Sequence, residues 1–249
     1  MDLTGQVIAV TGATSGIGEA TAVMAARAGA AVALAGRREE RLTEVAARIT
    51  DEGGRALAVP TDVGNEDSAR AFVQQAYEHL GRLDVLVNNA GVMLLGPVMG
   101  ADVAEWRRMI DVNCLGLLYC THAALPVMAE QGSGHIVNVS SVAGRRARLG
   151  TAVYNMTKFG VTGFSEALRQ EALHVGVRVT VVEPGFVETE LQGHNEGKDV
   201  VMQATEKMRS EIGKVLEADD IGAAILYAVA QPEHVNVSEV MVVPRGQRG

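Results

Sequence analysis

Residues 7–18 read VIAVTGATSGIG, and this stretch decides the fold of the chain. Four apolar residues come first with no polar alternation, as in a strand that is buried on both faces of a parallel sheet. A glycine turn follows and leads into a helical pattern, an arrangement that aims backbone N–H groups and a helix N-terminus at a phosphate. The spacing is G-x-x-x-G-x-G, and an ordinary turn between strand and helix is the competing interpretation. The candidate phosphate-binding residues are Gly12, Thr14, Ser15, Gly16, Ile17 and Gly18.

Strand-like and helix-like segments alternate along the rest of the chain. Apolar runs rich in β-branched residues occupy residues 7–11, 31–35, 56–60, 83–88, 135–140, 177–182 and 237–243. Helical patterns lie between them, at residues 16–28, 39–52, 68–80, 104–129, 151–175 and 218–230. This order predicts an α/β fold, a Rossmann-like doubly wound parallel sheet of seven strands with helices on both faces. We expect a single domain over residues 1–249, with a helical substrate lid at residues 186–215.

The composition is that of an ordinary globular chain. Of 249 residues, 47% are hydrophobic and 21% are charged, which excludes a disordered or fibrous protein. The formal net charge of −8 argues against nucleic acid or an anionic membrane surface as a partner. The start of the chain lacks the basic and apolar segments of a signal peptide, and we expect a cytoplasmic protein.

One apolar segment approaches the length of a membrane span. Residues 112–129 contain no Asp, Glu, Lys or Arg. They include Asn113, Gly116, His122 and Pro126, so we expect a helix buried between protein surfaces and no membrane partner. The six histidines show no metal-ligand spacing, and no metal site is expected.

The second strand-like run ends in Ala35-Gly36-Arg37-Arg38. An acidic residue at this position would accept a hydrogen bond from the adenosine ribose 2′-hydroxyl of NAD. A guanidinium cannot accept that bond, but it pairs well with a 2′-phosphate. Arg37 and Arg38 therefore predict NADP(H) as the cofactor; the alternative is that both arginines merely begin a charged helix.

Tyr154 and Lys158 form the most specific pair in the chain. They are four residues apart, so they share one face of a helix, and Tyr154 follows Ser141 by thirteen residues. A tyrosine with an unperturbed pKa of about 10 transfers protons poorly at neutral pH. An ammonium at ~4 Å supplies roughly 4 kcal/mol at an effective dielectric of about 20, enough to lower that pKa by about three units. The spacing predicts a proton-transferring tyrosine beside a lysine; a surface contact is the alternative.

Several motifs, in this order across nearly the whole chain, resemble the short-chain dehydrogenase/reductase family. They are Thr11 to Gly18, Asp62-Val63, Asn88-Asn89-Ala90-Gly91, Asn113, Ser141, Tyr154-x-x-x-Lys158 and Pro184-Gly185-x-x-x-Thr189. The resemblance implies that Tyr154 is the general acid and that Ser141 binds the carbonyl oxygen. It implies that Lys158 lowers the Tyr154 pKa and holds the nicotinamide ribose. Asn113 would hold a water of the proton relay and interrupt its helix.

The same resemblance implies further contacts with NADP(H). Asp62 and Val63 would contact adenine, and Asn89 would contact the ribose region. Val187 and Thr189 would meet the nicotinamide carboxamide. The other cofactor-binding residues that it implies are Ala90, Gly91, Pro184 and Gly185, together with Tyr154 and Lys158.

These patterns predict an NADPH-dependent oxidoreductase that transfers a hydride between the nicotinamide and a small carbonyl or alcohol. We expect reduction of an aldehyde or ketone in a biosynthetic or secondary-metabolite pathway. The alternatives are a non-catalytic NADP-binding sensor and an NADP-dependent epimerase or dehydratase. Arg145, Arg146 and Arg148 form either a solvated run or a recognition patch for an acidic substrate. A homotetramer is also expected, in which helices at residues 104–129 and 151–175 pack across subunits.

Overall fold

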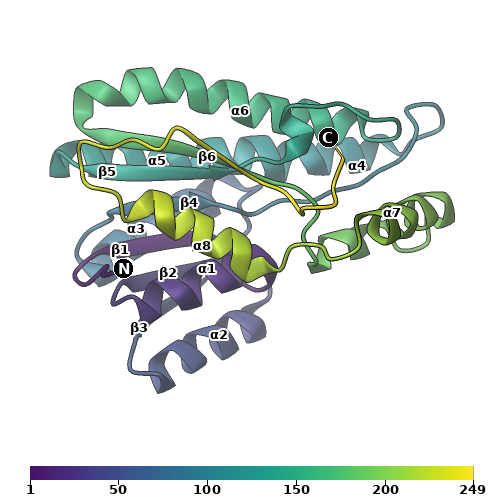
Figure 1. Cartoon of the computed structure of the whole chain (residues 1–249). Helices are drawn as coiled ribbons and strands as arrows, with labels where there is room; N and C mark the ends of the chain where they lie inside the picture. The colour runs from purple at the N-terminus through teal and green to yellow at the C-terminus, as the bar shows by residue number, and fades with distance from the viewer. Residues whose placement is uncertain (249) are drawn as a thin grey trace.

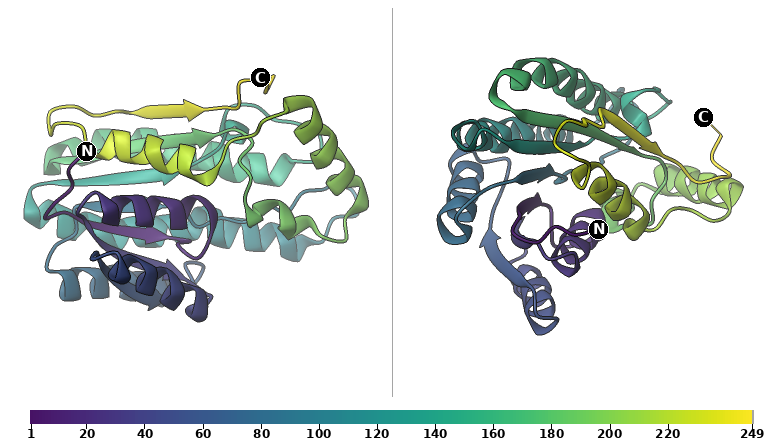
Figure 2. Two further views of the ribbon diagram at one scale, coloured as in Figure 1. Left: turned by 60° about the horizontal axis from the view of Figure 1, so that its bottom comes forward. Right: turned by 60° about the vertical axis from the view of Figure 1, so that its left-hand side comes forward.

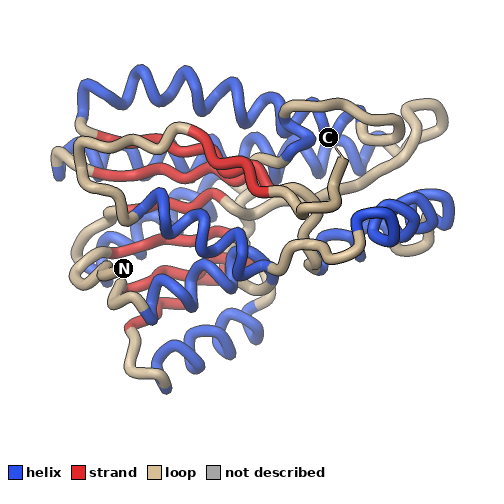
Figure 3. Tube along the Cα trace, viewed as in Figure 1, coloured by secondary structure: helices blue, strands red, loops and turns tan. Residues whose placement is uncertain are grey.

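The computed structural model describes residues 1–248, which form one sheet covered by helices (Figure 1, Figure 3). The strands are β1 (Val7–Thr11), β2 (Ala31–Gly36), β3 (Arg55–Pro60), β4 (Val85–Asn88), β5 (Gly134–Val139), β6 (Val177–Pro184) and β7 (Glu239–Val242). Over the described residues they make a seven-stranded sheet in the order β3-β2-β1-β4-β5-β6-β7. All neighbouring strands run parallel. The predicted doubly wound sheet in a single domain is confirmed.

Helices cover both faces of the sheet (Figure 2). On one face lie α1 (Gly16–Arg27), α2 (Glu39–Asp51) and α8 (Ala218–Val229). On the other lie α3 (Glu66–Leu80), α5 (Gly116–Gln131) and α6 (Ala152–Ala172). Ile8 and Val10 of β1 point into the first layer, and Ala9 points into the second. Both faces are therefore apolar, which explains why the strands show no polar alternation.

The helical pattern predicted over residues 104–129 is broken in the structure. A π-helical turn, Asp111–Leu115, joins α4 (Val103–Ile110) to α5. Asn113 lies in this turn with only 2% of its surface exposed, and its side chain bonds to the backbone of Val92. Single π-turns of this kind recur at functional sites, because the extra residue redirects a side chain. The interruption expected at Asn113 is present.

The helical run Val103–Gln131 is long and apolar enough to cross a membrane by length and composition alone. Within it, Cys120, Ala124 and Met128 of α5 are completely buried in the layer between the sheet and its helices. These residues pack against other protein groups and contribute to the core. The run is a core helix, as its polar interruptions predict.

Residues 186–215 leave the sheet after β6 and lie beyond its carboxyl edge (Figure 1). They contain a 3₁₀ turn, Glu190–Asn195, and α7 (Asp199–Ile212), so the helical content expected there is found. Buried Asn195 ties this 186–215 segment to the chain that follows β4. Its Oδ1 accepts from Leu95 N at 2.8 Å, and its Nδ2 donates to Met93 O at 2.9 Å. The segment therefore stands over the strand ends where ligands bind in such folds.

Gly18 is packed too tightly to carry a side chain. A Cβ atom there would lie 2.3 Å from the Gly12 carbonyl oxygen, whereas one at exposed Gly163 in α6 would meet nothing within 4 Å. Helix propensity alone favours alanine over glycine by roughly 0.5–1 kcal/mol at both positions. We predict that Gly18→Ala lowers the midpoint of urea unfolding, while Gly163→Ala leaves it unchanged or raises it. Equal shifts in the two variants would contradict this packing argument.

Candidate active site

A cleft of about 1000 Å³ opens at the carboxyl ends of the central strands. The strand order reverses between β1 and β4, and ligands of open α/β sheets bind at such a switch point. The lining comes from the glycine turn, the end of β2, the turn after β4, the start of α6 and the 186–215 segment. Every site residue named from the sequence lines this cleft, except Gly18 and Asn113, which lie behind its wall.

The glycine turn is held open by its backbone and by Asn89. Gly12 has a φ of +68° and Gly16 a φ of +55°, in the left-handed region that glycine enters without steric strain. The side-chain amide of Asn89 donates to Thr11 O at 2.9 Å and to Gly12 O at 3.3 Å. Gly18 packs against the same two neighbours, Gly12 and Asn89. Asn89 therefore braces the turn as well as lining the cleft.

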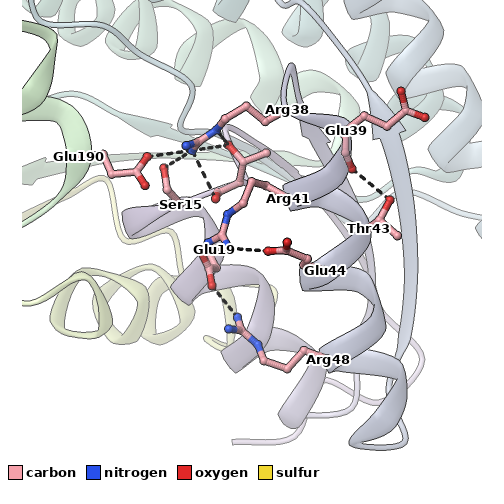
Figure 4. Close-up of polar contacts among 10 residues, drawn as sticks. Ser15, Glu19, Arg38, Glu39, Arg41, Thr43, Glu44, Arg48 and Glu190 are labelled. Atoms are coloured by element: carbon pink, nitrogen blue, oxygen red, sulfur yellow. Dashed lines mark hydrogen bonds and ion pairs between the residues drawn. The ribbon is translucent and has the colours of Figure 1, made fainter.

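Arg37 and Arg38 follow β2 but have different surroundings, and Figure 4 shows those of Arg38. The Arg38 guanidinium is engaged: Nη2 donates to Thr14 Oγ1 at 3.0 Å and to Ser15 Oγ at 2.9 Å. It also pairs with Glu190 of the 186–215 segment at 2.9 Å. Arg37 is exposed and lines the cleft, and its side chain makes no hydrogen bond or ion pair with the residues that the structure describes. Arg37 is thus the guanidinium available to a further anion.

The side chains of Ser141 and Tyr154 lie next to each other in the cleft, close enough for the Ser141 hydroxyl to oppose the rise in the Tyr154 pKa. Ser141 follows β5, and its Oγ accepts from Ala143 N at 3.1 Å, which caps the short 3₁₀ turn after it. The hydroxyl of the neighbouring Ser140 is buried and donates to the Lys158 carbonyl oxygen at 3.1 Å. Ser141, and not Ser140, therefore contacts the tyrosine hydroxyl.

Tyr154 and Lys158 are both buried, with 7% and 6% of their surfaces exposed. The Lys158 ammonium lies 5.9 Å from the centre of the Tyr154 ring and donates to Val139 O at 2.9 Å. Burial raises the pKa of Tyr154 to about 12, against the opposing effect of the Ser141 hydroxyl. Burial also lowers the pKa of Lys158 to about 8. The expected lowering of the tyrosine pKa by Lys158 is not found in this geometry, because desolvation of the phenolate dominates.

Asn113 anchors the chain after β4 to α6. Its Oδ1 accepts from Val92 N at 2.8 Å, and its Nδ2 donates to Val92 O at 2.9 Å and to Thr157 Oγ1 at 3.2 Å. Gly91 lies between Asn113 and Lys158, since a Cβ atom there would be 3.4 Å from Asn113 Oδ1 and 3.8 Å from Lys158 Nζ. Asn113 and the Lys158 ammonium therefore flank Gly91, and the Asn113 amide bonds to protein groups.

The residues implied to hold the rest of the cofactor lie on two sides of the cleft. Asp62 and Val63 follow β3, and Val187 and Thr189 follow β6. A Cβ atom at Gly16 would lie 3.1 Å from Thr189 Cγ2, so the 186–215 segment begins against the glycine turn. Within residues 1–248, no group of three or more His, Cys, Asp or Glu side chains is arranged to hold a metal ion.

Asn155, next to the tyrosine, is a site residue that the sequence argument missed. Its Nδ2 donates to Ala143 O at 2.6 Å and to Arg146 O at 2.9 Å. These bonds fix the loop that joins Ser141 to α6. The only sequence signal for it is its position inside the Tyr-x-x-x-Lys motif.

The Arg145–Glu183 pair is a second feature that the sequence did not reveal. Glu183, in β6, has 1% of its surface exposed and accepts a hydrogen bond from Arg145 Nε at 2.6 Å. Burial raises the pKa of Glu183, and Arg145 opposes that effect. Arg145 also pairs with Glu239 of β7. Of the three arginines after Ser141, Arg145 therefore ties this loop to the sheet.

A parallel sheet with a glycine turn at its switch point defines a dinucleotide-binding α/β protein. Residues 6–199 match the short chain dehydrogenase family. Over 242 residues the chain is 40% identical to an uncharacterized oxidoreductase of Staphylococcus aureus strain USA300, covering 97% of this chain and 98% of that protein. The chain belongs to the short-chain dehydrogenase/reductase family of oxidoreductases.

Solved structures agree with this assignment. The closed form of serine dehydrogenase complexed with NADP⁺ matches with a TM-score of 0.90 and 34% identity, over 98% of this chain and 97% of that one. A metagenomic short-chain oxidoreductase in complex with NADP matches with a TM-score of 0.81 and 34% identity, over 96% and 97% of the two chains. The fold and cleft described above are therefore those of the family.

The buried lysine makes stability depend on pH. Because the folded-state pKa of Lys158 is about 8 against 10.5 for an unperturbed lysine, the unfolded chain binds more protons between these values. We predict that stability rises from pH 8 to pH 10 relative to Lys158→Met, by on the order of 3 kcal/mol for the full shift. Denaturant unfolding without nucleotide measures this difference. Lys207→Met, which removes an exposed lysine from α7, should follow the wild type; parallel pH curves for Lys158→Met and the wild type would contradict the prediction.

Proposed function

We propose that this protein is an NADPH-dependent reductase of small aldehydes or ketones, able also to oxidise the corresponding alcohols. One observation carries the proposal: the adjacent Ser141 and Tyr154 side chains, buried Lys158 and a glycine turn flanked by Arg37 share one cleft. The first two elements suit proton transfer to a carbonyl oxygen, and the third suits a phosphorylated dinucleotide.

The lining residues fit a dinucleotide. A side chain at Gly16 would fill the gap between the glycine turn and Thr189, so glycine keeps the N-terminal amides of α1 open to a pyrophosphate. When bound, NADPH supplies the hydride. Arg37 would hold its 2′-phosphate and Lys158 its nicotinamide ribose. The remaining contacts proposed are Asp62 and Val63 with adenine, Asn89 with ribose, and Val187 and Thr189 with the carboxamide.

Tyr154 is the proposed proton donor. With a pKa of about 12 its phenol is protonated at neutral pH and is able to donate to a carbonyl oxygen that gains negative charge. The Ser141 hydroxyl would hydrogen-bond the same oxygen and stabilise that charge. Lys158, with a pKa of about 8, stays cationic at pH 7 and favours the phenolate left behind. Asn113 would hold a water beside Lys158 through which the proton is replaced.

The choice of NADP over NAD is supported by the end of β2. Arg37 has no partner among the described residues and faces the cleft, and the residues at the end of β2, Gly36 to Arg38, include no acidic side chain of the kind that accepts a bond from a ribose 2′-hydroxyl. The NADP complexes of two similar structures agree with this choice.

The substrate end combines apolar walls with cationic groups. Met93, Leu95 and Phe186 line the cleft, as do Arg146 and Arg148. Neither arginine forms an ion pair with a described residue, although the Arg148 guanidinium donates to Arg248 O at 3.3 Å. Both guanidinium groups would therefore attract an acidic substrate. The 186–215 segment would act as the lid that excludes water during transfer.

Three segments of the sequence bear on the identity of the substrate. Residues 88–97, 164–171 and 189–194 resemble clavulanate (clavaldehyde) dehydrogenase, a resemblance for which the comparisons above offer no support. We therefore propose only the class of reaction, which is reduction of an aldehyde or ketone within a biosynthetic or secondary-metabolite pathway. A panel of neutral, acidic and β-lactam-derived aldehydes addresses the choice.

We also propose a cytoplasmic homotetramer. Leu118 of α5 and Met156 and Phe159 of α6 are exposed apolar side chains, with 36%, 55% and 46% of their surfaces accessible. Exposed apolar side chains on neighbouring helices favour burial against another subunit. These two helices are therefore the proposed contact between subunits.

Replacing the proton donor tests the mechanism. Tyr154→Phe keeps the packed ring and deletes the hydroxyl, so we predict a loss of 10²–10⁴-fold in turnover, about the contribution of general acid catalysis. NADPH binding, followed by its fluorescence, should be retained. Tyr77→Phe alters a tyrosine with 38% of its surface exposed on α3 and should behave as wild type. More than about a tenth of the wild-type rate in Tyr154→Phe would refute the assignment.

Replacing the free guanidinium tests the cofactor. A charge-assisted bond to a 2′-phosphate contributes roughly 1.5–3 kcal/mol, so the wild type should prefer NADPH over NADH by about ten- to hundredfold in kcat/KM. We predict that Arg37→Ser removes most of this preference without lowering kcat with NADH. Arg70→Ser, at an exposed position on α3, should keep it. A wild-type preference for NADH would refute the choice of NADP and leave the catalytic residues unaffected.

A further inference from the structure

Arg38 lies at the edge of the cleft in a group of hydrogen-bond donors that we call the anion cradle (Figure 4). The cradle consists of the Arg38 guanidinium, the hydroxyl groups of Thr14 and Ser15, and the N-terminus of α1. Its guanidinium is held beside two hydroxyl groups, Thr14 Oγ1 at 3.0 Å and Ser15 Oγ at 2.9 Å. Ser15 is also the N-cap of α1, so the positive end of a helix faces the same point. One guanidinium, two hydroxyls and a helix N-terminus are a donor set that suits a phosphate.

The cradle lies next to two helices, α1 and α2, that are joined by ion pairs. Glu19 of α1 pairs with Arg48 of α2 at 2.8 Å and with Arg41 of α2 at 3.6 Å (Figure 4). These ion pairs, one near each end of α2, hold α2 against α1, and Arg38 directly precedes α2. The position of Arg38 is therefore set by regular structure rather than by a loose loop.

An anion of the protein itself occupies this cradle. The carboxylate of Glu190, at the start of the 3₁₀ turn in the 186–215 segment, lies 2.9 Å from Arg38 Nη2. Arg38 and Ser15 hold the pKa of Glu190 below its usual value, so the group is ionised at neutral pH. The Glu190 side chain is 59% exposed and the Arg38 side chain 47%, so the contact is able to break without uncovering a buried charge.

We propose that Glu190 competes with the NADP 2′-phosphate for Arg38, which would bind this phosphate together with Arg37, and that Glu190 is thereby a specificity-determining residue of the cofactor site. The inference rests on the proposed use of NADP. A phosphate dianion and a carboxylate cannot share one guanidinium without repulsion, so the 2′-phosphate displaces Glu190. A nucleotide without that phosphate leaves the ion pair in place.

Two consequences follow from this competition. Part of the 2′-phosphate binding energy is used to break the Arg38–Glu190 pair, so NADP is bound less tightly than the cradle allows. Because Glu190 follows Thr189, which contacts the glycine turn, its release also frees the start of the 186–215 segment. Binding of the 2′-phosphate thus changes the contacts of the 186–215 segment, which would cover the substrate.

Isothermal titration calorimetry with two fragments of the cofactor measures binding at its adenosine end alone. Adenosine 2′,5′-bisphosphate and 5′-AMP differ only by the 2′-phosphate. We expect Glu190→Gln to bind the bisphosphate about two- to fivefold more tightly than the wild type, the range that an exposed ion pair supports, and 5′-AMP equally well. In an Arg38→Ala background the same substitution should have no effect. Glu188→Gln is the matched control, because Glu188 pairs with Arg209 instead.

Hydrogen exchange gives a second readout in the wild type. The bisphosphate should raise exchange over residues 188–196, and 5′-AMP should not. Unchanged bisphosphate affinity in Glu190→Gln would overturn the competition. A loss of affinity for both fragments would also overturn it and would indicate that Glu190 only helps to hold the nucleotide in place. If the wild type binds the bisphosphate no better than 5′-AMP, the choice of NADP fails and this inference fails with it.

Discussion

The pairing of β1 with β4 is the constraint on which the rest of the site depends. Thr11 ends β1, and its Oγ1 accepts hydrogen bonds from the backbone N–H groups of Asn89 and Ala90, both at 3.0 Å. The Asn89 side-chain amide in turn donates to the carbonyl oxygens of Thr11, the last residue of β1, and of Gly12. These bonds close the junction where the strand order reverses, and they leave the two strand ends side by side. The glycine turn and the wall opposite it are therefore positioned by one set of bonds.

Burial governs the chemistry on the β5 side of this junction. Tyr154 and Lys158 are almost fully enclosed, and their charged forms lose solvation. The result is a phenol that is neutral at pH 7 beside a lysine whose pKa is lowered to about 8. In the proposed function, this is the state from which Tyr154 donates its proton. Glu183 is equally buried but has Arg145 as a partner, so the loop carrying Ser141 is tied to the sheet by a charged pair.

The 186–215 segment links the two halves of the cleft. Asn195 bonds to the chain after β4, and Glu190 reaches the end of β2. Both contacts lie in the same short 3₁₀ turn, so a change at one end of the cofactor site bears directly on the cover of the substrate site. Thr189 against the glycine turn completes this connection. In the proposed function, recognition of the nucleotide and enclosure of the substrate thus share one structural element.

The break at Asn113 was implied by the family resemblance, because the local pattern continues as one helix over residues 104–129. The sequence by itself determined the order of strands and helices, the glycine turn and the Tyr154–Lys158 spacing. These features depend on local periodicity and on spacings of a few residues, which the chain carries directly. Only the tertiary structure decided that Arg38 is engaged by Glu190 while Arg37 is free, and that Arg145 belongs to Glu183. It also decided the sense of the Tyr154 pKa shift. Such contacts join residues from distant strands, and pKa values depend on how completely packing removes water, which no local spacing records.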